Sequence, residues 1–294
     1  MVLMTVVIGG LAIFVGATRD VGAGLLPDRA GRKHASVFLA GPLSLIARLE
    51  RTSTIIWLVG LFILGATYGS IFGTAGDLLK SNPMMSKLIG TAATDAANRA
   101  IVLSFANKLT IIFAVLAIIP GLITMFRLNG DERKGYFEQL HARSVSRAHL
   151  FFAIAGFGLV VTLASFFLAV CGMYVAGAAS MGDNMPSLSR FMRGFLGFAP
   201  AVIVSFGFGA LLSGLLPKLQ TIAWILPAYG FFSLYLGALM NFPKWATQLT
   251  PFGWVNTVPV KAVNWGTAGW MTALGVILVL AGYVAYRRRD LLEN

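Results

Sequence analysis

Long apolar runs separated by shorter polar runs dominate this chain. Most of the runs reach the ~17–25 residues that a helix needs to cross a bilayer, and the first, at residues 2–17, falls just short. The pattern therefore predicts an all-α, polytopic transmembrane helix bundle with about seven spans. The predicted spans are residues 2–17, 54–73, 109–126, 150–181, 194–216, 219–241 and 265–286.

The composition supports this assignment. Of the 294 residues, 57 % are hydrophobic and only 12 % are charged, whereas a soluble domain carries roughly 25 % charged residues. The mean hydropathy is +0.79. Such a chain has little soluble mass, so its folding consists of packing helices in lipid.

Two polar segments are predicted to carry helices outside the bilayer. From Pro42 onwards, apolar residues such as Leu43 and Ile46 share one helical face while Arg48 lies near the other, which predicts an interfacial helix lying along the membrane. The alternative, that this stretch simply begins the next span, stays open. Residues 74–108 have moderate apolar content and predict short amphipathic helices.

The later segments carry further local signals. The pair Pro120-Gly121 interrupts the third span and predicts a kink there. The glycine-rich fifth span predicts close helix packing. Residues 242–264, with Trp245 and Trp254, predict an ordered segment at the aromatic belt.

Basic residues are unevenly distributed between the two sides of the predicted bundle. The segments 18–53, 127–149, 217–218 and 287–294 together hold fifteen Lys and Arg residues, and the opposite segments hold eight. The positive-inside rule therefore predicts that the first group, with the carboxyl terminus, is cytoplasmic. The net charge of +12 follows from bases at span ends, with no soluble basic domain, which argues against a nucleic-acid partner.

Nothing in the sequence predicts a catalytic, metal or cofactor site. The single Cys171 lies in an apolar run, and the three histidines lack partners at metal-ligand spacing. The sequence contains no GxxxxGK[ST] phosphate loop, HExxH or GxSxG motif. The confident spans also lack ionisable residues, which weakens the interpretation as an ion-coupled carrier.

The charged run at residues 129–147 is the strongest candidate for function. Asn129 is predicted to cap a short helix, with Glu132 completing an approximate capping box. Acids lie at its start and bases such as Arg143 toward its end, as the helix dipole favours. Gly135 would allow close approach of a partner. A solvated loop between two spans is the alternative.

This run resembles the coupling stretch of ABC exporter permeases of the second type, with an acid-acid-x-x-Gly-x-x-Glu-x-Leu pattern followed by Ser-Arg. In that family the stretch is a cytoplasmic coupling helix that faces the ATPase subunit. Ser144 or Val145 stands where proline is frequent. The residues implied to couple here are Asp131, Glu132, Gly135, Glu138, Leu140, Arg143, Ser146 and Arg147.

Three further stretches are similar to tetronasin-type (polyketide antibiotic) exporter permeases. They lie at residues 19–57, 249–259 (LTPFGWVNTVP) and 286–291 (YRRRDL). The resemblance implies that the chain consists of three parts. Residues 1–17 would be the last span of a preceding half, 18–53 a cytoplasmic linker with the interfacial helix, and 54–294 a six-span permease domain.

The resemblance implies a multi-pass cell-membrane permease, or half-permease, that exports a small hydrophobic or amphipathic compound such as an antibiotic by alternating access. This chain would bind no cofactor, because ATP and Mg would sit on a partner ABC ATPase subunit. Membrane lipid and a second permease half, or a second copy, are the other implied partners. By family analogy the substrate would contact the second, fifth and sixth spans. The alternative is a non-transporting scaffold, immunity protein or truncated permease remnant.

Overall fold

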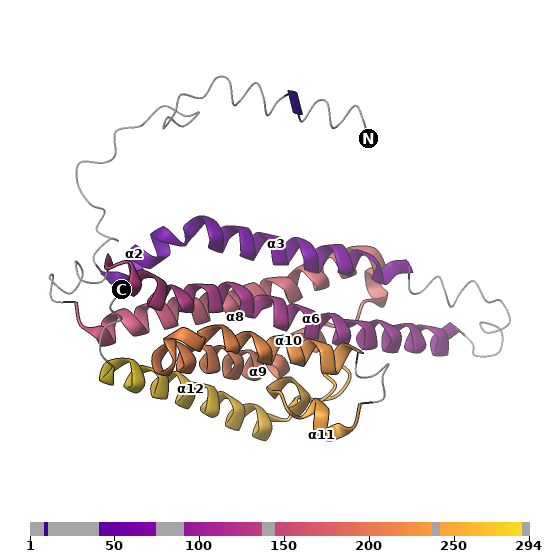
Figure 1. Cartoon of the computed structure of the whole chain (residues 1–294). Coiled ribbons are helices and arrows are strands. Elements are labelled where there is room, and N and C mark those ends of the chain that lie inside the picture. Colours follow the sequence, from indigo (N-terminus) through magenta and orange to yellow (C-terminus); the bar gives the residue numbers. More distant parts are fainter. Residues whose placement is uncertain (1–8, 11–40, 75–90, 137–144, 237–241, 290–294) are drawn as a thin grey trace. The chain divides into compact units, whose positions relative to one another are not determined.

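A computed structural model describes residues 9–10, 41–74, 91–136, 145–236 and 242–289 (Figure 1). The chain divides into two units, residues 1–40 and 41–294, and the helix bundle belongs to the second. The predicted first span lies outside the described residues, except for positions 9–10.

Every regular element in the described part of the second unit is a helix, as predicted. Five of these helices are long and apolar enough to cross a membrane. The elements in chain order are α2 (Pro42–Leu49), α3 (Arg51–Ser70), α6 (Thr91–Arg133), α8 (Arg147–Met181), η2 (Gly182–Asn184), α9 (Leu188–Leu215), η3 (Pro217–Trp224), α10 (Ile225–Phe231), η4 (Phe232–Leu236), α11 (Lys244–Thr247), η5 (Pro251–Trp254) and α12 (Trp265–Arg288).

The helices α6, α8 and α9 form the centre of the bundle. The helix α3 packs on α8, and α12 packs on α9, so both lie at the periphery (Figure 1). Burial agrees with this order, since about two-thirds of the apolar windows of α6 and α9 are buried, against 22 % for α3 and α12. The exposed apolar faces of the outer helices are suited to lipid.

Small residues bring the outer helices close to the central ones, as predicted for the glycine-rich span. A Cβ atom added at Gly214 of α9 would lie 2.0 Å from the carbonyl oxygen of Gly282 in α12. One added at Gly65 of α3 would lie 2.0 Å from the carbonyl oxygen of Ala169 in α8. Such contacts let backbones touch where lipid provides no hydrophobic driving force between helices.

The structure corrects the prediction of short separate helices in residues 74–108. Residues from 91 onwards belong to α6, which continues without a break through Pro120; residues 75–90 lie outside the described part. The reason is that Val102, Ala106 and Leu109 form one buried face, while the polar Asn107 donates a hydrogen bond to the Val258 carbonyl.

The sixth predicted span is also different in detail. A single helix over 219–241 is not observed, because a 3-10 helix (η3), a short α-helix (α10) and a π-helix (η4) follow one another through its described part. Pro217 starts this succession and Pro227 lies within α10. Neither proline has an N–H group for regular helical hydrogen bonds.

The segment before the second span forms a helix of its own, α2, and does not simply begin that span; its position along the membrane stays a prediction. The helix starts with Pro42 and is separated from α3 at Glu50. Residues 242–264 are ordered as well, with Phe252 and Val258 buried among the helices.

Candidate functional site

The candidate site is the end of the bundle where α6 finishes. The predicted helix cap at Asn129 is wrong, because Asn129, Asp131 and Glu132 form the last turns of α6 itself. Gly135 then adopts a positive φ of 71°, and its N–H donates to the Glu132 carbonyl over 3.0 Å. Glycine at this position terminates the helix in the left-handed conformation, so here it serves a turn.

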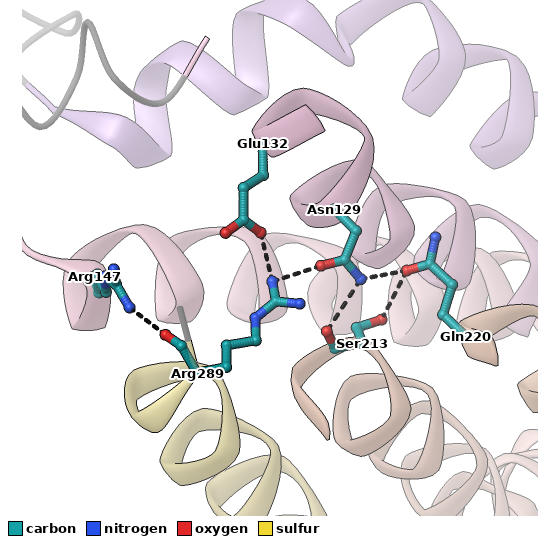
Figure 2. Close-up of polar contacts among 6 residues, drawn as sticks. All are labelled: Asn129, Glu132, Arg147, Ser213, Gln220 and Arg289. Carbon is teal, nitrogen blue, oxygen red and sulfur yellow. Dashed lines mark hydrogen bonds and ion pairs between the residues drawn. The ribbon is translucent and has the colours of Figure 1, made fainter. Parts of the chain in front are cut away.

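Glu132 is buried and forms an ion pair with Arg289, which lies just beyond α12 (Figure 2). The same Nη2 atom of Arg289 donates to Asn129 Oδ1 over 2.8 Å. These contacts join the end of α6 to the end of α12. The guanidinium carbon also lies 5.0 Å from the centre of the Tyr286 ring, within cation–π range.

Asn129 extends the network to a third and a fourth element. Its Nδ2 atom donates to the Ser213 carbonyl over 3.0 Å and to Gln220 Oε1 over 2.6 Å (Figure 2). Ser213 belongs to α9 and Gln220 to η3. The hydrogen bond between the Asn129 and Gln220 amides therefore holds η3 against the end of α6.

The start of α8 is attached to the same network. Ser146 caps α8 by accepting a hydrogen bond from the His149 N–H over 3.2 Å. The next residue, Arg147, donates to the Arg289 carbonyl oxygen over 2.8 Å (Figure 2). Arg289 thus binds α6 through its side chain and α8 through its backbone.

The electrostatic setting of Arg289 is mixed. Burial lowers the pKa of its guanidinium below the usual value, with Arg147 and Arg133 acting in the same direction, while Glu132 opposes the shift. Burying a charge requires a partner of opposite sign. Glu132 provides that partner.

A second ion-pair cluster lies on the other side of α6. Arg127 contacts Glu50, which is buried at the junction of α2 and α3. The Nε atom of Arg127 also lies 3.7 Å from Asp131 Oδ2, one helical turn further on. Ile46 and Leu49 of α2 border the same small pocket as these two α6 residues. This cluster joins α2 to α6.

The structure thus places several of the predicted site residues at this end of the bundle. Asp131 and Glu132 lie in the two clusters, Gly135 forms the turn, and Ser146 and Arg147 begin α8. Glu138, Leu140 and Arg143 lie outside the described residues. Their predicted coupling role stays a prediction.

Sequence reasoning missed the residues that hold this end together: Glu50, Arg127, Gln220 and Arg289. Glu50 and Arg289 are charged residues within four positions of the predicted spans 54–73 and 265–286, and that location could have drawn attention to them. Their partners could not be found in this way. The segments predicted to share one side of the membrane do meet at this end, through the contacts of α2, α6, α8, η3 and α12.

Comparison with known proteins gives the chain its family. A family model described as "Multidrug efflux system permease Rv1217c, C-terminal domain" matches residues 39–287. The multidrug efflux system permease protein Rv1217c of Mycobacterium tuberculosis (strain ATCC 25618 / H37Rv) is 32 % identical over 290 residues, which cover 95 % of this chain and 50 % of that protein. The chain therefore spans about half the length of this relative. From the match over most of its length, the chain belongs to the family of the C-terminal domain of the multidrug efflux system permease Rv1217c.

Proposed function

We propose that this chain is the membrane-embedded half of an ATP-driven, ABC-type efflux permease and that the segment following α6 receives force from an ATPase subunit. The family supports an efflux permease. Active export by a membrane bundle whose sequence contains no phosphate-binding loop needs an external source of energy. The charged run at residues 129–147 supports the coupling role, because it resembles the stretch that faces the ATPase subunit in ABC exporter permeases.

One observation carries the proposal: the helices on either side of residues 134–146 both contact Arg289. The preceding helix α6 contacts the Arg289 side chain through Glu132, and the following helix α8 contacts its carbonyl through Arg147. A displacement of this segment would therefore act on α12. Through Arg127 and Glu50 it would also act on α2.

The proposed coupling residues are those of the charged run, with Glu138, Leu140 and Arg143 contacting the ATPase and the others supporting them. ATP and Mg belong to that partner. This end of the bundle would face the cytoplasm, in agreement with the bias of basic residues. The cargo would be a hydrophobic or amphipathic compound, consistent with the multidrug description of the relative, and a second permease half would complete the pathway.

The test combines association and export. Glu138→Ala with Leu140→Ala changes the proposed contact without removing a described contact of the network. We expect this variant to lose co-purification with an ABC ATPase subunit and to lose ATP-dependent efflux in cells that supply the ATPase and the second half. Lys244→Ala, in α11 at the opposite end, is the matched control and should retain both.

Unchanged association and unchanged efflux in the double variant would exclude the coupling role. Association without ATP-dependent efflux, in the unmodified chain with all partners present, would favour the non-transporting scaffold instead. Arg147→Ala is a poorer probe, because it also removes the hydrogen bond to Arg289.

A further inference from the structure

Among the described residues, the fully exposed charges at the end of the bundle where α6 finishes are all positive. Its three described acids, Glu50, Asp131 and Glu132, are turned into ion pairs with Arg127 and Arg289. The cations that remain exposed among the described residues of this end are Arg48, Arg51, Arg133, Lys134, Lys218, Arg287 and Arg288. Pairing of the acids therefore leaves the described part of this surface predominantly basic, with Asp131 as its one partly exposed acid.

Three of these cations stand at the ends of helices that are long and apolar enough to cross a membrane, where a membrane surface is expected. Arg51 is the first residue of the spanning segment 51–74, Arg133 the last of 99–133, and Arg288 the last of 265–288. Long basic side chains at span ends extend their charged groups toward the lipid headgroups while their stems stay in apolar surroundings. Positive charge at this level complements anionic headgroups.

The helix α2 adds apolar groups to the same surface. Ile46 packs into the protein, whereas Leu43 and Leu49, on the two flanks of that buried side, are 52 % and 58 % exposed. Arg48 points away from the buried side and is exposed. A short helix with exposed leucines beside exposed arginines has the character of a segment that lies in a bilayer interface.

We propose that this surface, called here the basic rim, binds anionic lipid headgroups and gives the chain a preference for anionic over zwitterionic lipid. The basic rim consists of the seven exposed cations named above. The preference does not depend on the proposed transport function. Exposed leucines next to the bases favour a bilayer over an acidic protein as the occupant.

The expected size follows from the charges. One Lys or Arg near an anionic surface contributes ~1 kcal/mol, or about a fivefold preference. Changing two rim arginines should therefore lower the preference by up to about thirtyfold at low ionic strength. Added salt should reduce the preference of the unmodified chain, because exposed charges are screened.

The experiment uses the purified full chain reconstituted in equal mixtures of phosphatidylcholine and phosphatidylglycerol. Spin-labelled analogues of each lipid report their relative association with the protein surface. We expect phosphatidylglycerol to be favoured, and Arg48→Gln with Arg51→Gln to reduce that preference severalfold. Lys244→Gln with Lys261→Gln, exposed at the opposite end, is the matched control and should leave it unchanged.

A second pair, Arg287→Gln with Arg288→Gln, tests the rim on a different helix and covers the case in which the first variant fails to fold. Equal association of the two lipids with the unmodified chain would overturn the proposal. So would an equal loss in the control, or rim variants that lose an acidic protein partner but keep the lipid preference. Because neither ATPase nor substrate is present, these outcomes are independent of the test of transport.

Discussion

Replacing Arg289 by methionine should destabilise the bundle far more than the same change at its exposed neighbour Arg288. The substitution Arg289→Met leaves the Glu132 carboxylate, whose side chain is 3 % exposed, without its guanidinium. It also removes the donor to Asn129 Oδ1. Removing one partner of a buried ion pair costs about 3–5 kcal/mol. Glu132 keeps a further contact, which places the expected loss near ~3 kcal/mol.

The double variant separates the pair from general damage at this end. Glu132→Gln combined with Arg289→Met removes both charges, so no buried carboxylate is left without its guanidinium. We expect the double variant to be less destabilised than the sum of the single variants, by about 0.5–3 kcal/mol. This recovery identifies the ion pair as the source of the effect.

The assay is reversible unfolding in mixed micelles, with increasing denaturing detergent and helical circular dichroism as the signal. Arg288→Met is the matched control, because Arg288 is exposed. This substitution should change the free energy of unfolding by less than about 0.5 kcal/mol. A loss for Arg289→Met no larger than that of the control would refute the reasoning. Strict additivity of the two single changes would refute it as well.

Two more predictions concern the contacts between helices. Gly214→Ala places a Cβ atom 2.0 Å from the carbonyl oxygen of Gly282 and should lower the free energy of unfolding by about 1–3 kcal/mol in the same assay. Gly269→Ala is the control, because a Cβ atom there has nothing within 4 Å, and it should not destabilise the protein. Equal losses for the two variants would contradict the close-packing argument. Arg127→Met leaves the buried carboxylate of Glu50 without its arginine, so we expect faster amide hydrogen exchange in α2. Adding Glu50→Gln should partly restore the slower exchange rate. An unchanged exchange rate in Arg127→Met would show that the ion pair does not hold α2 in place.

The spans could be predicted because they depend on local composition. Residues 150–181 contain no charged residue and form α8 almost as expected. The prediction failed where polar residues belong to buried contacts. The moderate apolar content of residues 74–108 favoured short helices outside the bilayer. The described part from residue 91 belongs to α6 instead, and the polar Asn107 side chain donates to the Val258 carbonyl. Asn129 was predicted to cap a helix because it is a polar residue before a charged run. Its amide instead forms hydrogen bonds with Ser213, Gln220 and Arg289.

Part of the candidate site was also open to prediction. The charged run at residues 129–147, with acids at its start and bases toward its end, identified the region. Asp131, Glu132 and Arg147 do lie in the two clusters and contacts found there. The two clusters themselves were not predictable, since their members Glu50, Arg127 and Arg289 are distant in the sequence. A pattern along one helix contains no information about which other helix ends beside it.

The sequence by itself determined the helical class and the approximate positions of the five long apolar helices in the described part of the chain, because a chain this apolar must satisfy its backbone hydrogen bonds within each helix. Only the tertiary structure decided which charges neutralise each other. Glu132 and Arg289 are 157 residues apart, and their contact exists because α9 packs on both α6 and α12. Three acids pair with arginines at this end, and Glu50 and Glu132 are buried in those pairs. The fully exposed charges of the described rim are therefore basic, which depends on packing over the whole bundle.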